Sequence, residues 1–120
     1  MAGQNVPVVL IPRYTSFLGP LTFPGEAVPA SPYDRLSVVY WQGPYLAGVM
    51  AVQLAFQQSN DGTNWTDCPG GPWAPTSVLP GEFPFTADLS MAWMRLVITL
   101  TGAGSGLTCW VRGFFEKRER

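Results

Sequence analysis

Carboxylates are the side chains of this sequence best suited to catalysis. Two carboxylates flanking a bound sugar would form the acid/base arrangement that is typical of glycosidases. The candidates are Glu26, Asp34, Asp61, Asp67, Glu82 and Asp88. All six lie in or beside predicted turns, where Asp and Glu are common for conformational reasons. The sequence also has no histidine, which excludes Ser-His and Cys-His nucleophiles, and we therefore expect a protein that is not an enzyme.

Oxygen-rich side chains also gather around one predicted hairpin tip, at Asn60, Asp61, Asn64 and Asp67. They could offer ligands to a calcium ion, although their spacing does not match an EF-hand loop. The alternative is that Asn and Asp are here simply as turn residues. The glycine-rich run 102–106 joins two predicted strands instead of opening a helix, so it lacks the geometry of a phosphate-binding loop. We expect no metal and no cofactor.

The two cysteines, Cys68 and Cys109, are far apart in the sequence and form no C-x-x-C motif. A disulfide between them is possible, but two free thiols are the stronger expectation because the chain shows no secretory signal. The apolar run 8–11 is too short to span a membrane. The net charge of −1 provides no basic field that would attract nucleic acid. We therefore expect synthesis in a cytoplasm, without membrane or nucleic-acid partners.

Several tryptophans fall on strand faces opposite the predicted core, namely Trp41, Trp93 and Trp110. Exposed aromatic rings can stack on sugars or enter a pocket of a protein partner. The alternative is that these rings pack under a loop or against the core. The sequence leaves both possibilities open.

The elements that would position these side chains are strands. Twelve prolines and thirteen glycines leave little room for helices. Four segments alternate clearly between apolar and other residues, at 34–42, 49–59, 91–101 and 107–115, and weaker strands are expected at 14–23, 64–67 and 82–87. The predicted inward residues are Leu36, Val38, Tyr40, Met50, Val52, Leu54, Phe56, Met94, Leu96, Ile98, Leu100, Leu107, Cys109 and Val111.

This pattern predicts an all-β fold, an antiparallel β-sandwich or jelly-roll-like domain of seven to eight short strands. We expect the sandwich to cover residues 14–115. Residues 1–13 are expected to form an extended N-terminal arm, with an edge strand as the alternative. Residues 116–120 form a short tail of alternating charges.

Two parts of the chain, 50–67 and 88–115, resemble known β-sandwich proteins. The run Ser59-Asn-Asp-Gly-Thr-Asn-Trp65 resembles a discoidin-like hairpin, in which Ser-x-Asp-Gly-x-x-Trp places a tryptophan behind the turn. The run from Asp88 to Thr99 resembles the following strand of such modules. Both pieces are also similar to small structural proteins of tailed bacteriophages, which often end in a strand much like 108–114. The latter resemblance implies a capsid decoration or cement protein.

Charged residues make up only 12% of the chain, about half of the usual share of roughly 25%. A surface short of charge indicates that protein partners cover part of it, although a surface rich in Ser, Thr, Gln, Gly and Pro is the alternative. We expect contacts through 1–13, the loop 68–80 and the C-terminal tail. The predicted contact residues are Val8, Leu10, Pro12, Trp73, Trp110, Arg118 and Arg120.

Together these features favour a structural virion protein that decorates a bacteriophage capsid after assembly in the host cytoplasm. Its expected partners are the major capsid protein or other virion proteins, and further copies of itself. The alternative function is a carbohydrate-binding module on a tail or surface structure, which the aromatic residues and the discoidin-like hairpin would suit.

Overall fold

The computed structural model describes residues 4–44, 51–75, 79–104 and 106–117. Within these ranges the chain forms nine strands and no helix, and hence no helix that is long and apolar enough to cross a membrane. The strands are β1 (Gln4–Leu18), β2 (Leu21–Pro24), β3 (Val28–Pro29), β4 (Arg35–Gln42), β5 (Ala51–Ser59), β6 (Thr66–Asp67), β7 (Gly81–Asp88), β8 (Trp93–Thr101) and β9 (Gly106–Lys117).

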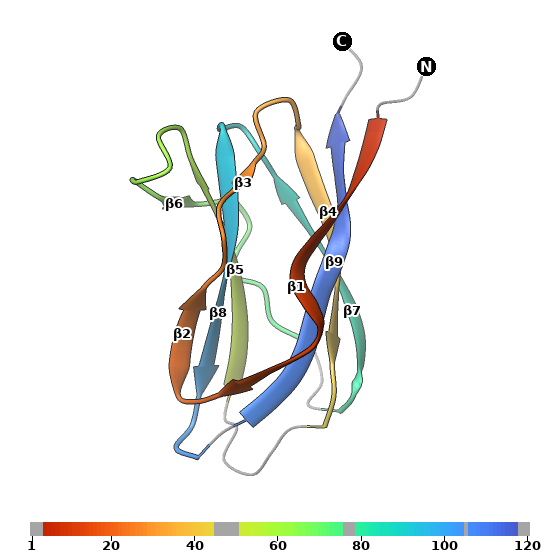
Figure 1. Ribbon diagram of the computed structural model, residues 1–120, viewed down its shortest axis with the longest axis vertical. Coiled ribbons are helices and arrows are strands. Elements are labelled where there is room, and N and C mark those ends of the chain that lie inside the picture. Colours follow the sequence, from red (N-terminus) through yellow and green to blue (C-terminus); the bar gives the residue numbers. More distant parts are fainter. Residues whose placement is uncertain (1–3, 45–50, 76–78, 105, 118–120) are drawn as a thin grey trace.

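These strands form two antiparallel sheets that pack face to face (Figure 1). Sheet A has the order β1-β9-β4-β7, and sheet B has the order β2-β8-β5-β6, with β3 also paired to β8. The predicted all-β antiparallel sandwich is confirmed.

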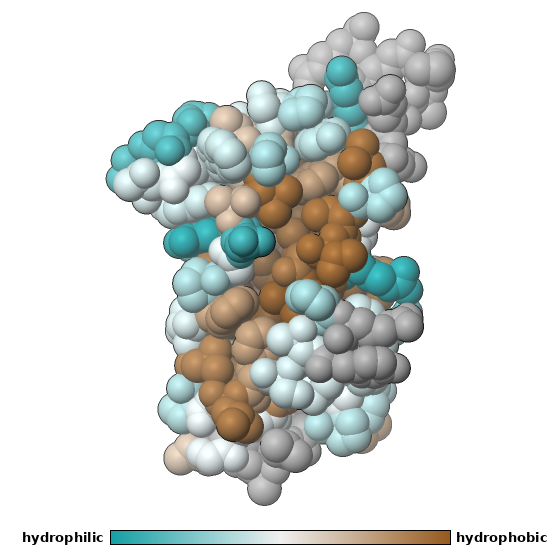
Figure 2. Space-filling view, viewed as in Figure 1, coloured by the Kyte–Doolittle hydropathy of each residue, from teal (hydrophilic) through white to brown (hydrophobic). Residues whose placement is uncertain are grey.

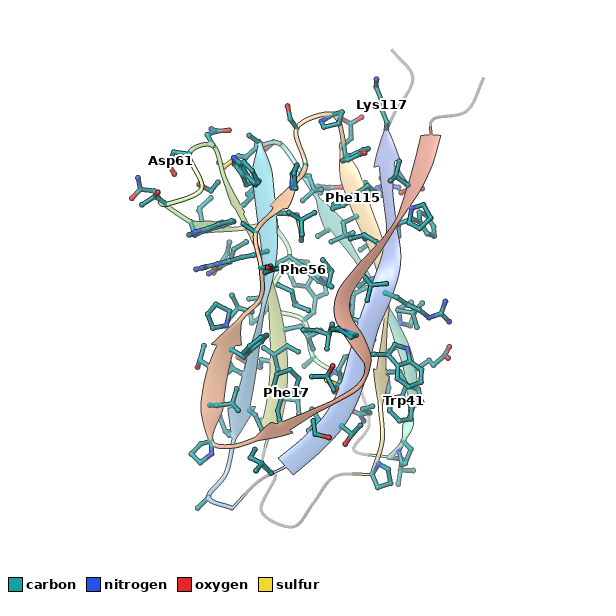
Figure 3. The ribbon with its side chains drawn as sticks, viewed as in Figure 1. Phe17, Trp41, Phe56, Asp61, Phe115 and Lys117 are labelled. Atoms are coloured by element: carbon teal, nitrogen blue, oxygen red, sulfur yellow. The ribbon has the colours of Figure 1, made fainter. Side chains whose placement is uncertain are left out.

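The core lies between the two sheets and contains the residues that alternation predicts, together with others such as Ile11, Phe17 and Phe115. Apart from Met50, which lies outside the described residues, every predicted inward residue is 4% exposed or less. Phe17, Phe56 and Phe115 point into the same space between the sheets (Figure 3). Burial of these apolar side chains is the main source of stability for such a sandwich.

The N-terminal segment is part of sheet A. The pairing of β1 with β9 runs from Gln4 opposite Lys117 to Leu18 opposite Gly106, with irregularities on either side of Ile11. Two structures were predicted for the first residues, an extended arm and an edge strand. Residues 4–13 form the edge strand, so the extended arm is wrong for that range. At the other end, Glu116 and Lys117 belong to β9 and not to a separate tail.

The strand expected at 14–23 is interrupted at Gly19-Pro20, where the chain changes sheets. Leu18 pairs with Gly106 in sheet A, whereas Leu21 pairs with Leu100 in sheet B. The rings of Phe17 and Phe23, 5.1 Å apart, pack together across this corner. The N-terminal third of the chain thus closes one side of the sandwich.

Gly113 in β9 allows an unusually close approach to β4. A Cβ atom at this position would overlap the carbonyl oxygen of Ser37 and the Cα of Val38. Because both obstacles are backbone atoms, they could not move aside without disturbing the pairing of the two strands.

We predict that Gly113→Ala lowers the free energy of unfolding by about 1–3 kcal/mol, since the added methyl group must displace β4. Gly81→Ala is the matched control, because a Cβ there would meet no described atom within 4 Å, and it should change stability by less than about 0.5 kcal/mol. Urea unfolding followed by tryptophan fluorescence measures both. Equal stability of the two variants would contradict this account of β9.

Candidate binding surface

The outer face of sheet A carries apolar side chains in register across its four strands. Phe114 lies between Pro7 on β1 and Ser37 on β4. In the next row, Arg112 lies between Val9 and Val39. On β7, Thr86 and Pro84 extend these two rows to the other edge of the sheet, opposite Ser37 and Val39.

These rows surround a groove of about 500 Å³, which we call the outer groove. All four strands of sheet A line it, and its residues are Pro7, Val8, Val9, Ser37, Val38, Val39, Pro84, Phe85, Thr86, Arg112, Gly113 and Phe114. Val9 is 63% exposed and Phe114 is 38% exposed, which is unusual for side chains of this size. Apolar side chains gathered in an open groove are typical of a surface that another molecule covers.

A pair of stacked tryptophans adjoins one end of the outer groove. Trp41 and Trp110 are opposite each other on β4 and β9, with ring centroids 4.0 Å apart and planes inclined by 13°. Trp110 is only 7% exposed, whereas Trp41 is half-buried and points away from the core (Figure 3). The pair extends the apolar surface along the strands.

Charged residues occupy the other end of the outer groove. The Arg35 guanidinium lies 3.7 Å from the Asp88 carboxylate and 4.0 Å from that of Glu116. Ser37 donates a hydrogen bond of 3.4 Å to Glu116. Arg112 is exposed within the groove itself. The groove thus combines apolar side chains with one exposed arginine, and a cluster of charges lies at one end.

The outer face of sheet B has a different character. Arg95 donates a hydrogen bond of 2.9 Å to Gln57 and lies 4.4 Å above the ring of Trp65. Gln57 in turn donates to Asp67 at 3.0 Å. Because its polar groups pair with one another and its tryptophan is covered by a cation, this face offers less apolar surface to a partner than sheet A.

The predicted contact residues are divided between these surfaces and the core. Val8 and Leu10 are half-buried and pack against the core, whereas Pro12 is exposed. Figure 2 shows hydrophobic residues gathered in the middle of the face that β1 crosses. Arg118 and Arg120 lie outside the described residues.

Two predicted aromatic anchors are held by the protein itself. Trp73 exchanges two backbone hydrogen bonds with Leu54, of 2.7 and 2.8 Å, and its ring meets Phe56 edge-on at 4.9 Å. Trp110 lies beneath the surface beside Trp41. In both cases the sequence shows an aromatic residue outside the main core set, but not the partner that buries it.

Of the twelve residues that line the outer groove, only Val8 is a predicted contact residue, although Pro7 and Val9 lie in the predicted contact segment 1–13. The apolar Val39 and Phe114 were not predicted. The sequence feature that could have revealed these residues is the apolar character of the outward-facing side chains on the central strands β4 and β9. Val39 and Trp41 are apolar on the side opposite Leu36 and Val38, so β4 is apolar on both faces. An antiparallel strand with one face in water normally shows polar residues there.

The hairpin tip that could have held calcium uses its carboxylate internally. Asp61 accepts hydrogen bonds at one oxygen from Ser59 at 2.9 Å and from the backbone of Thr63 and Asn64 at 2.8 Å. Its other oxygen accepts from the Asn64 side chain at 2.7 Å. The described residues contain no group of three or more His, Cys, Asp or Glu placed to hold a metal. This geometry is that of a turn held by an Asp side chain.

Both cysteines are free and buried. Burial raises the pKa of the Cys68 thiol to about 11, with smaller contributions from Asp67 and Asp88, and that of Cys109 to about 12. Thiols in such surroundings are inert because the thiolate is scarcely populated at neutral pH.

Comparisons with known proteins concern the fold. No family model matches the chain, and no curated protein matches it. The chain is similar to VP2 in the subviral particle of infectious bursal disease virus, with a TM-score of 0.65 and 10% identity over 97% of this chain and 32% of VP2. It is also similar to dimeric latent PorU from Porphyromonas gingivalis, with a TM-score of 0.54 and 9% identity over 98% of this chain and 13% of PorU. The chain thus spans about a third of VP2 and a smaller part of PorU, and these likenesses show a shared fold.

We predict that Asp61 makes stability depend on pH. The backbone N–H groups of Asn64 and Thr63, followed by Ser59, hold the pKa of Asp61 well below its usual range. The ionised carboxylate therefore stabilises the fold above about pH 4, and this contribution is lost as the pH falls below it. Between about pH 5 and pH 2, wild-type protein should lose unfolding free energy more steeply than Asp61→Asn. If the unfolding free energies of the two proteins, measured with urea, fell equally with pH, this role of Asp61 would be contradicted.

We also predict that both thiols are protected by the fold. At pH 8, a colorimetric thiol reagent should react with neither Cys68 nor Cys109 in folded protein within minutes, and with both at once in guanidinium chloride. Rapid reaction of the folded protein would show that one thiol is accessible.

Proposed function

We propose that this chain is a structural protein of a virus particle, in which the outer groove is covered by another protein. The observation that carries the proposal is the apolar groove on sheet A. Removing Val9 and Phe114 from water would favour association, because the hydrophobic effect scales with the apolar area that is buried. Interfaces between proteins commonly combine such an apolar centre with polar residues at the rim.

The shortage of charge supports the same proposal. With 12% charged residues, the chain cannot surround its apolar side chains with charges as an ordinary soluble monomer does. Those charges include the cluster of Arg35, Asp88 and Glu116 at the end of the groove. Such a distribution of charge is consistent with a protein that functions as a subunit of a larger assembly.

The particle we propose is a bacteriophage head, which this chain would decorate or cement by binding the major capsid protein or another virion protein. The fold supports a virion role, since VP2 in a viral particle shares it over nearly the whole of this chain. The resemblance to tailed-phage structural proteins supports the finer proposal. Its two pieces fall on the β5–β6 hairpin and on β8 and β9, which belong to both sheets. The proposed location is the capsid surface, after assembly in the host cytoplasm.

The alternative is a carbohydrate-binding module. The observation that favours it is the presence of aromatic side chains beside Arg112 on the outer face of sheet A, with Phe114 exposed and Trp41 half-buried. Aromatic rings next to a hydrogen-bond donor can hold a sugar by stacking. Neither proposal requires catalysis, and the absence of enzymatic activity stays a prediction.

We predict that the chain cosediments with virus particles produced from the genome that carries its gene. Phe114→Asp should lower its occupancy in gradient-purified particles by about tenfold or more, because a charge replaces an apolar contact at the centre of the interface. Gln53→Asp, a change at an exposed position of β5 in sheet B, should leave occupancy unchanged.

A chain that stays at the top of the gradient, or a Phe114→Asp protein with wild-type occupancy, would contradict the proposal. Quenching of tryptophan fluorescence by added oligosaccharides, together with absence from particles, would favour the carbohydrate-binding alternative.

A further inference from the structure

The order of strands in sheet A would allow its outer face to pack against the same face of a second copy of this chain. β9 and β4 are the central strands, and β1 and β7 flank them. A two-fold axis that runs parallel to the strands, between β9 and β4, would place β9 on β4 of a second copy. The same rotation would place β1 on β7, and each cross-strand row would meet the corresponding row of the second copy.

The charges at the end of the outer groove are complementary under this rotation. Arg35 on β4 and Glu116 on β9 are opposite each other in register. The rotation brings each Arg35 over Glu116 of the second copy, so that two pairs of opposite charge form at once. Glu82 on β7 would likewise lie near Arg112 on β9 of the second copy. The rotation also places Arg112 of the two copies side by side across the axis, so this pair of like charges must be offset by Glu82 and by the two Arg35–Glu116 pairs.

In the two rows of the outer groove the shapes of the side chains are complementary as well, whereas in the next row Trp110 would meet Trp41 of the second copy. Phe114, the largest side chain of its row, would meet the small Ser37 of the second copy. Val9 would meet Pro84 in the next row, and the aliphatic stem of Arg112 would lie over Val39. Large residues opposite small ones allow two sheet faces to interdigitate at a crossing angle of about 30°.

The area of the face is sufficient for a weak dimer. Four strands about 4.8 Å apart give a width of about 19 Å, and four rows of two residues at about 3.4 Å per residue give a length of about 27 Å. Each copy would therefore bury about 500 Å², and the pair about 1,000 Å², which is near the lower limit for specific association.

We propose that the outer groove is covered by a second copy of this chain, in a two-fold dimer held by reciprocal Arg35–Glu116 pairs. The proposal rests on the proposed function in that both use the same face, and it names the occupant of that face. In a virus particle, each copy would cover the apolar groove of the other, so the protein that covers the groove is a second copy of this chain. The dimer would bind the particle through its remaining surfaces, and Phe114→Asp would lower occupancy by dissociating the dimer.

Sedimentation equilibrium from about 1 to 200 μM tests the proposal, since an interface of this size corresponds to weak association. Wild-type protein should form dimers in this range. Arg35→Glu alone and Glu116→Arg alone should each weaken the dimer by about 30-fold or more, because each places like charges opposite each other twice.

The decisive sample is an equimolar mixture of Arg35→Glu and Glu116→Arg proteins. In a mixed dimer both pairs across the interface again join opposite charges, although the pairing within each chain is still broken. The mixture should therefore form dimers at concentrations where each variant alone is monomeric. Circular dichroism confirms that the variants are folded, and Gln53→Glu on sheet B serves as a control that should dimerise like wild type.

A monomeric wild type, or a dimer that Phe114→Asp and both charge reversals leave intact, would overturn the proposal. Failure of the mixture to dimerise would also overturn it. A monomer that is nevertheless found in virus particles would contradict only the dimer, and a dimer that is absent from particles would contradict only the proposed function.

Discussion

The pairing of β4 with β9 determines which side chains face the core and which face outward. Eight consecutive residue pairs join these strands without a bulge, from Arg35 opposite Glu116 to Gln42 opposite Cys109. Leu36 and Val38 therefore enter the core, while Val39 faces outward beside Arg112. A slip of one residue would exchange the two faces completely. Gly113 keeps this pairing close, because a side chain there would strike the backbone of β4.

The same register makes the outer faces of the two sheets unlike each other. On the outer face of sheet B, Arg95 lies over the ring of Trp65 and donates a hydrogen bond to Gln57, and Gln57 donates a hydrogen bond to Asp67. On the outer face of sheet A, Phe114 and Val9 are exposed to solvent, and the salt-bridged charges Arg35, Asp88 and Glu116 lie at one end. The outer face of sheet A is thus more apolar than that of sheet B, although Leu18, Phe23 and Leu79 are also exposed elsewhere on the protein. This asymmetry links the fold to a role in assembly, since association would remove that surface from water.

The fold was predictable from local patterns, whereas the binding surface depends on contacts between distant segments. Alternation in the four clear strands identified the core, because the side-chain period of a strand is two. The N-terminal segment could be read as an arm or an edge strand because its partner, β9, lies at the other end of the chain. The burial of Trp110 likewise depends on Trp41, which only the register of β4 with β9 brings opposite it. The outer groove appears when all four strands of sheet A are placed side by side, and no single strand reveals it.

Hydroxyl-radical footprinting of the chain, isolated and in its native assembly, tests most directly whether the outer face of sheet A is covered. The account predicts that oxidation of Phe114 and Trp41 falls severalfold on assembly, whereas oxidation of Trp65 on sheet B changes little. Oxidation of Phe114 and Trp41 that is equal in the two samples would contradict the account, as would protection confined to Trp65.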